Sequence, residues 1–226
     1  MAIKIMKKTQ TKNHSIVLNF KPSFYFLDNI KNQKIDLKID KNSTVVFLSM
    51  SKNSFDKNIT FTVKKNCILK AYLIDLIKDS NHAFNIILNN ESNCKSFLFA
   101  KIFASKNGEG SINVISNVKR NNNNVTTEQE IKGFLLSDSA KINTIPSLVI
   151  DTNKINASHS VNIGRLNKDF IFYLESKGFD HKQAVNAIIE NEISILKNTY
   201  YNSKKHKIDA YQDVKLTINK MLNNEG

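Results

Sequence analysis

Short stretches in which apolar and polar residues alternate dominate roughly the first 165 positions of the chain. In residues 35–39, 59–63 and 112–116, apolar side chains occupy every second position or nearly so. Runs of about four to eight residues with this period, rich in Val, Ile, Phe and Thr, are typical of β-strands. The pattern therefore predicts that this part of the chain is mainly β.

The strands recur in pairs at a nearly constant spacing. Segments that begin at Leu37, Phe61 and Ile86 each contain an alternating strand, a polar turn with asparagine and a second apolar strand, and a segment from Leu148 has the same shape. A repeat of this length, here 24 and then 25 residues, is typical of stacked coils, so we expect a β-solenoid. An antiparallel sandwich with coincidental spacing is the alternative. The polar residues 117–129 are expected to form a loop.

The pattern changes to a helical period after residue 165. Asn167 is placed to cap a first helix that ends near Gly178, and Asp180 is placed to cap a second helix. Residues 200–207 are expected to form a hydrophilic connection, after which Asp209 can cap a third helix.

The two patterns predict two domains, a β domain at residues 1–165 and a helical subdomain at residues 166–226. An amphipathic helical segment needs a surface that covers its apolar stripe. The stripe can fold back on the strands or face a partner protein, and the sequence leaves both alternatives open.

The net charge of +13 raises the possibility of nucleic-acid binding. Only Arg120 and Arg165 among the 33 basic residues are arginines, and the lysines are scattered. Bidentate contacts to phosphate and guanine favour arginine, so the composition argues against nucleic acid as a partner. No run approaches the roughly 18 apolar residues of a membrane span, and no apolar run follows the early lysines. We therefore expect a cytoplasmic protein with no membrane partner.

The sequence contains no recognisable catalytic constellation. It lacks a P-loop, a Ser/His/Asp order with supporting motifs and a glycine-rich dinucleotide turn, so we expect that the protein is not an enzyme. Cys67 and Cys94 are too far apart for a CxxC metal motif. They are interpreted as small buried hydrophobic residues, with a shared metal or redox role as the alternative.

The stretch from residue 129 to residue 178 resembles the C-terminal signature of the SufB/SufD family. It contains the family's leucine-rich strand, its Pro-x-Leu-x-Ile segment, its histidine and its Phe-Tyr-Leu-x-Ser-Lys-Gly ending without a gap. The matching residues are Leu135, Leu136, Ser137, Asp138, Ala140, Pro146, Leu148, Ile150, His159, Gly164, Phe172, Tyr173, Leu174, Ser176, Lys177 and Gly178.

The resemblance implies a right-handed parallel β-helix (a β-solenoid) followed by a small C-terminal α-helical subdomain. In the family, two such proteins associate through their β-helices, and the C-terminal helices carry SufC, an ABC-type ATPase. The SufBCD complex builds iron–sulfur clusters and passes them on. The resemblance therefore implies a scaffold for iron–sulfur cluster assembly, with a transient cluster and no permanently bound cofactor.

The residues around the histidine indicate the SufD branch. The SufB branch carries a cysteine where this chain has Ile131, and it carries Glu-His-Glu where this chain has Ser158-His159-Ser160. The cysteine that SufD proteins carry just before the serine is replaced by Ala157. By this resemblance, His159 is the candidate iron ligand at a subunit interface, and a hydrogen-bonding role at that interface is its alternative.

The resemblance also implies a surface for the ATPase on the helices. Its candidate residues are Phe172, Tyr173, Leu174, Lys182, Val185 and Ile189. Anchoring of the first helix and a core role for the second are the alternatives.

Three functions are compatible with these features of the sequence. The first is a scaffold subunit that joins a SufB-type subunit and a SufC-type ATPase. The second is a self-sufficient homodimeric scaffold that pairs with an identical subunit, and the third is a basic β-solenoid that binds nucleic acid. Proteins of the SufB/SufD family are usually longer than this chain, and the difference lies on the N-terminal side.

Overall fold

The structure is a computed structural model that describes residues 14–18, 23–26, 33–49, 52–198, 200–202, 207–209, 211–212 and 215–216. The chain divides into two compact units, residues 1–163 and 164–226.

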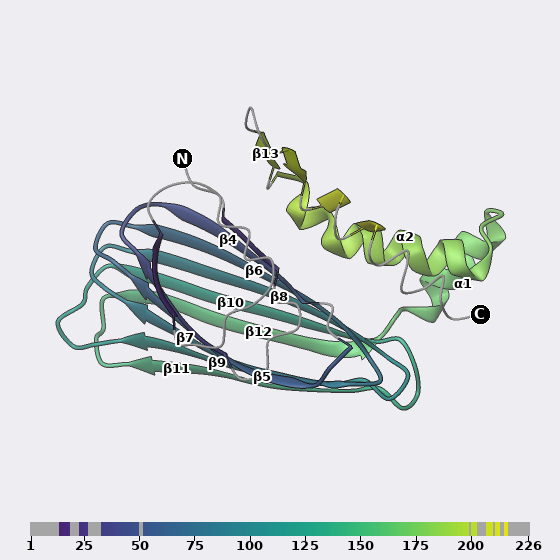
Figure 1. Ribbon diagram of the computed structural model, residues 1–226, viewed down its shortest axis with the longest axis horizontal. Helices are drawn as coiled ribbons and strands as arrows, with labels where there is room; N and C mark the ends of the chain where they lie inside the picture. The colour runs from purple at the N-terminus through teal and green to yellow at the C-terminus, as the bar shows by residue number, and fades with distance from the viewer. Residues whose placement is uncertain are drawn as a thin grey trace. The chain divides into compact units, whose positions relative to one another are not determined.

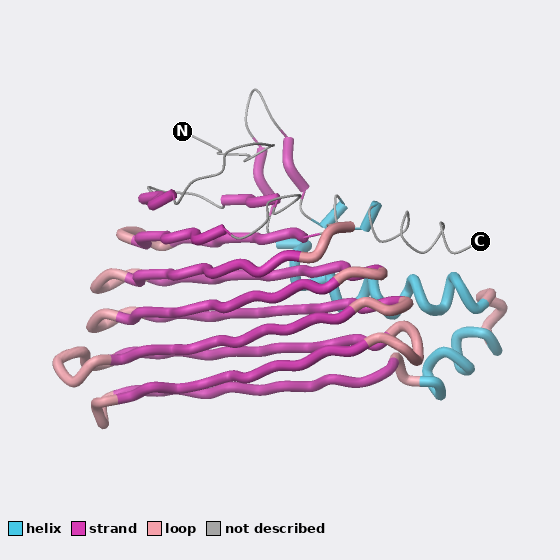
Figure 2. Tube along the Cα trace, turned by 60° about the horizontal axis from the view of Figure 1, so that its bottom comes forward, coloured by secondary structure: helices cyan, strands magenta, loops and turns pink. Residues whose placement is uncertain are grey.

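The first unit is a parallel β-helix built from two sheets (Figures 1 and 2). Odd-numbered strands form one six-stranded sheet and even-numbered strands form the other, so consecutive strands lie in opposite sheets. All pairs between β1 and β11 with a defined register are parallel. This topology confirms the predicted β-solenoid and excludes the antiparallel sandwich. The strands are β1 (His14–Leu18), β2 (Ser23–Phe26), β3 (Gln33–Ile39), β4 (Ser43–Ser49), β5 (Phe55–Val63), β6 (Ile68–Lys78), β7 (Asn81–Asn90), β8 (Lys95–Ser105), β9 (Glu109–Val118), β10 (Val125–Leu135), β11 (Lys141–Ile150) and β12 (Ile155–Arg165).

Apolar side chains from both sheets fill the interior of the β-helix. Because side chains of a strand alternate between two faces, every second residue of β5 and β7 points inward and is buried. Phe47 and Phe61 meet there edge to face, with ring centroids 5.9 Å apart. Full burial of one such large apolar side chain stabilises the fold by about 1.5–3 kcal/mol.

The strand register confirms one predicted repeat and corrects the next. Leu37 pairs with Phe61, as the 24-residue spacing predicts. Phe61 then pairs with Leu88, not with Ile86, so this spacing is 27 residues. Turn lengths set the spacing, because the strands must stay in register whereas the turns are free to lengthen along the chain.

Asparagines form the tight turns at one end of the coils, as expected. Asn66, Asn93 and Asn124 adopt φ values of 63°, 57° and 57°, a left-handed region that asparagine tolerates better than most residues. The predicted loop at residues 117–129 was too long, because only residues 119–124 connect β9 to β10. The remaining polar residues belong to strands and bond to neighbouring strands.

The second unit begins with the two predicted helices. Asn167 caps α1 (Lys168–Ser176) by accepting hydrogen bonds from two backbone N–H groups. Gly178 follows the helix with a φ of +94°, a conformation that favours glycine. Asp180 and Gln183 form a capping box at the start of α2 (His181–Ile193).

The chain beyond α2 differs from the prediction in one respect. A 3-10 helix, η1 (Ser194–Asn198), follows α2, and then β13 (Tyr200–Asn202) and β14 (Lys207–Asp209) pair antiparallel. The predicted hydrophilic connection therefore contributes a short hairpin. Of the predicted third helix, residues 211–212 and 215–216 are helical, and the rest lies outside the described residues.

Within the part of the chain that the structure describes, each helix is too short or too polar to cross a membrane.

Two glycines offer a matched test of the coil packing. A Cβ atom at Gly108 would lie 2.9 Å from the Ser105 carbonyl oxygen and 3.0 Å from Ile77 Cγ2, whereas a Cβ atom at Gly164 would meet nothing within 4 Å. We expect Gly108→Ala to lower the free energy of unfolding by about 1–3 kcal/mol. Gly164→Ala should change it by less than about 1 kcal/mol. Chemical denaturation of both variants measures this difference, and equal effects would contradict the packing described.

Candidate functional site

The last coil of the described β-helix consists of β11 and β12, which are the terminal strands of the two sheets. Terminal strands leave backbone N–H and C=O groups without a neighbouring strand, and this makes them templates for pairing with another chain. Ile145 and Val149 on β11 are exposed to 54% and 50%, and Val161 and Ile163 on β12 are also exposed. The last coil therefore combines an unpaired edge with exposed apolar side chains.

His159 lies near the middle of β12 and is exposed. Ile155 packs against the core, and a Cβ atom at the buried Gly133 would lie 3.3 Å from Ile163. Because side chains alternate along a strand, His159 shares the inward-facing side of β12 with Ile155 and Ile163. The histidine is thus on the core-facing side of a coil that no further strand of the described chain covers.

The two positions at which the family resemblance implies a cysteine hold no sulfur here. Ile131 is fully buried in the core on β10, and Ala157 is half-buried on β12. No group of three or more His, Cys, Asp or Glu side chains within the described residues is arranged to hold a metal ion. The last coil therefore offers one imidazole, which suits iron but is too few donors to hold a cluster alone.

The other four histidines share no spacing that suggests a metal site, so the sequence predicts that each of them lies on the surface. This prediction was wrong for His82. His82 is buried on β7, where Nδ1 contacts Asp75 Oδ1 at 2.8 Å and Nε2 contacts Ser80 Oγ at 3.1 Å. His181 is exposed and contacts Glu175 at 2.8 Å. His206 lies outside the described residues, and only the backbone of His14 is described.

The polar cluster around His82 was missed by sequence reasoning, although the strand pattern contains a signal for it. His82 precedes Phe84 and Ile86 on the inward-facing positions of β7. Asp75 likewise lies between the inward-facing Leu73 and Ile77 on β6. Polar residues at inward positions of two facing strands indicate that they bond to each other.

A second polar network inside the β-helix was also missed. Ser96 Oγ donates to Thr127 Oγ1 at 2.9 Å, Thr127 donates to Ser116 Oγ at 3.0 Å, and Gln129 Nε2 donates to the same Ser116 oxygen at 2.8 Å. All four side chains are buried. Their hydrogen bonds offset the cost of placing polar groups in the core, so these residues have a structural role.

The predicted partner surface on α1 is largely accessible. Phe172 is 72% exposed and Tyr173 is 52% exposed, whereas Leu174 is half-buried. The rings of Phe170 and Tyr173 stack with centroids 6.2 Å apart, and Lys177 Nζ lies 5.5 Å from the Tyr173 ring. Exposed aromatic side chains grouped on one helix are typical of protein-binding surfaces.

The predicted partner residues on α2 differ in exposure. Lys182 is exposed and Val185 is half-buried, but Ile189 is only 1% exposed. Ile189 is buried together with Ala184, Ile188 and Ile193 on the same helix. The accessible part of the predicted surface therefore centres on α1 and the start of α2.

Residues 13–191 match the family model described as the SUF system FeS cluster assembly, SufBD core domain. An iron–sulfur cluster assembly SufBD family protein of Archaeoglobus fulgidus is 36% identical over 66 residues, which cover 29% of this chain and 18% of that protein. SufD of Escherichia coli K12 is 28% identical over 101 residues, which cover 45% of this chain and 24% of SufD. SufD of Bacillus subtilis is 29% identical over 77 residues, which cover 34% of this chain and 18% of that SufD. The aligned region thus spans less than a quarter of each of these relatives.

Substitution of His159 and of His82 tests which of the two side chains contributes to the stability of the fold. We expect His159→Ala to change the free energy of unfolding by less than about 0.5 kcal/mol, because the side chain is exposed. His82→Ala should lower it by about 3–5 kcal/mol, since it leaves the buried Asp75 carboxylate without its imidazole partner. Urea denaturation followed by circular dichroism measures both values. A large loss of stability in His159→Ala would instead assign that residue a structural role.

Proposed function

The chain belongs to the SufBD core-domain family of the SUF system for iron–sulfur cluster assembly, and from this we propose that it is a SufD-type scaffold subunit of that system. In this proposal the protein acts in the cytoplasm, catalyses no reaction and holds an iron–sulfur cluster only as transient cargo. The observation that carries the proposal is the match of residues 13–191 to the family, together with the parallel β-helix that the same residues form.

We propose that the last coil pairs with a second β-helix, either a SufB-type subunit or an identical one. Support comes from the unpaired edges of β11 and β12 and from the exposed Ile145 and Val149. Addition of a partner strand would satisfy the free backbone groups, and contact with a partner would remove the apolar side chains from water. Pro146, which has no N–H group, lies in β11 and is compatible with an edge strand.

His159 is proposed to contribute an imidazole ligand to a cluster at this interface. Because this chain offers one donor there, the remaining ligands would come from thiolates of the partner subunit. A neutral imidazole is a suitable iron ligand, and its exposed position on β12 leaves it accessible to the partner. The proposal thus divides the ligands between two chains, and neither chain alone would retain the cargo.

The exposed aromatic side chains of α1 are proposed to bind a SufC-type ATPase. Phe172 and Tyr173 supply large apolar area at a low cost in conformational entropy, and aromatic side chains are frequent among the residues that dominate binding energy. Nucleic-acid binding receives no comparable support, because the described surface features that favour a partner are apolar and aromatic.

Crossed variants test the two proposed interfaces. We expect Phe172→Ala to weaken binding of a purified SufC-type ATPase from the same genome by about tenfold or more, since loss of a central aromatic contact costs about 1.4 kcal/mol or more. Pairing with a SufB-type subunit should be unchanged. Ile145→Lys should weaken pairing with the SufB-type subunit and leave binding of the ATPase unchanged, because it places a charge on the edge strand of the last coil. Calorimetry measures both affinities.

Each variant is the control for the other, because each changes one of the two interfaces. Melting temperatures close to that of the wild-type chain would show that both variants are folded. Failure of the wild-type chain to bind any SufC-type ATPase would refute the ATPase interface. Pairing of the wild-type chain with itself as tightly as with a SufB-type subunit would favour the homodimeric scaffold.

Cluster loading tests the role of His159. The wild-type complex with a SufB-type subunit and the ATPase is reconstituted anaerobically with ferrous iron and sulfide, and bound cluster is measured by visible absorbance and iron content. We expect His159→Ala to lower cluster content at least severalfold, because one ligand is lost. Asn156→Ala, which removes an exposed side chain from the opposite face of the same strand, is the control and should load normally. Normal loading of His159→Ala in an intact complex would show that the histidine is not a ligand.

A further inference from the structure

The two cysteines of the chain lie on neighbouring coils. Cys67 immediately precedes β6, and Cys94 immediately precedes β8. The register pairs Ile68 with Lys95, and the Lys95 N–H donates to the Cys67 carbonyl oxygen with an N···O distance of 2.9 Å. Cys67 and Cys94 therefore occupy equivalent positions on adjacent coils, which neighbouring strands place about 4.8 Å apart.

Both thiols point into the same apolar interior. Cys67 is 5% exposed and Cys94 is 0% exposed, and both belong to the core cluster of the β-helix. The pKa of Cys94 is raised to about 12, mainly by burial, with smaller contributions from Cys67 and the Glu91 carboxylate that act against backbone hydrogen bonds. Burial also raises the pKa of Cys67, with added contributions from Asp40 and Glu91. At neutral pH both side chains are therefore protonated thiols.

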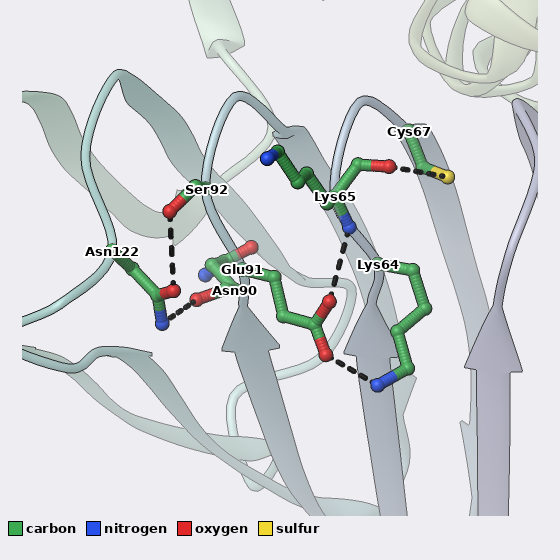
Figure 3. A network of polar contacts seen from close by, with 7 residues as sticks. All are labelled: Lys64, Lys65, Cys67, Asn90, Glu91, Ser92 and Asn122. Carbon is green, nitrogen blue, oxygen red and sulfur yellow. Dashed lines mark hydrogen bonds and ion pairs between the residues drawn. The ribbon is translucent and has the colours of Figure 1, made fainter.

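A polar clamp holds the two turns in register (Figure 3). The Glu91 carboxylate pairs with Lys64 Nζ and accepts a hydrogen bond from the Lys65 N–H at 3.1 Å. These contacts join the turn before Cys67 to the turn before Cys94. Cys67 itself donates from Sγ to the Lys65 carbonyl oxygen at 3.5 Å. The clamp thus ties together the two turns that precede Cys67 and Cys94.

We propose that Cys67 and Cys94 are a redox pair that a low-molecular-weight disulfide of the glutathione class converts into a disulfide between the two coils. Disulfides join residues whose Cα atoms lie about 4.4–6.8 Å apart, and the spacing of adjacent coils falls within this range. The pair is a modification site that is independent of the proposed scaffold role. It involves neither the last coil nor the helices.

The exchange proceeds in two steps. The thiolate of Cys67, the more exposed residue, attacks one sulfur of the reagent, so that a mixed disulfide forms and one thiolate leaves. The thiolate of Cys94 then attacks the Cys67 sulfur, and the second thiolate leaves. Two electrons pass from the cysteine pair to the reagent, which is reduced to two thiols that take up the two protons.

The proposal is tested on the full-length folded chain with oxidised glutathione. We expect intact mass to fall by two hydrogen atoms and non-reducing peptide mapping to recover a Cys67–Cys94 peptide. The reaction should be slow at pH 7 and about tenfold faster per pH unit up to pH 9, because the thiolate is the nucleophile and both thiols titrate above this range. The oxidised chain should melt at a higher temperature than the reduced chain, because the disulfide restricts the unfolded state.

Single-cysteine variants distinguish a disulfide between Cys67 and Cys94 from separate modification of each thiol. Cys94→Ser should stop at a mixed disulfide on Cys67, whereas Cys67→Ser should react far more slowly, because Cys94 is fully buried. Mixed disulfides on both cysteines of the wild-type chain, or a cross-link between two chains in place of the internal disulfide, would overturn the proposal. So would an internal disulfide that forms only after the chain is unfolded in urea.

Discussion

The in-register stacking of parallel coils is the constraint on which the rest of the β-helix depends. Each inward-facing side chain lies above the equivalent residue of the next coil, as Leu37 lies beside Phe61 and Phe61 beside Leu88. A shift of one residue would turn every apolar side chain of a strand toward water, so the core specifies the register strongly. Turns can then vary in length without disturbing the core, which explains why the repeat lengthens along the chain.

The same stacking decides which polar residues are structural and which are available for function. His82 lies within the stack, where Asp75 and Ser80 bond to it, whereas His159 lies on the last coil and is exposed. A coil in the interior is covered on both sides by its neighbours, but a terminal coil is covered on one side only. A second protein can therefore contact the side chains of the last coil, whereas side chains such as Cys67 and Cys94 are enclosed by neighbouring coils.

Much of the fold and part of the candidate site are encoded in local sequence patterns. Alternation in residues 35–39 and 59–63 is sufficient to predict strands, and Asn167 and Asp180 are sufficient to predict two capped helices, because these signals act within a few residues. The residues of the family signature, including His159, can also be recognised in the amino-acid sequence. The polar strand residues Thr127 and Gln129 were misassigned to a loop, because their hydrogen-bond partners lie on other strands, between 11 and 31 positions away in the sequence.

The β-helix class, the helical character of the C-terminal part and the family of the chain can all be recognised from the order of its residues. The burial of His82 and Ile189, the exposure of His159 and Phe172, and the adjacency of Cys67 and Cys94 become visible in the folded chain alone. The two groups of features differ in the range of the interactions that set them. Strand period and helix caps depend on neighbours in sequence, whereas burial and pairing across coils depend on residues about 27 positions away, whose spacing the variable turns conceal.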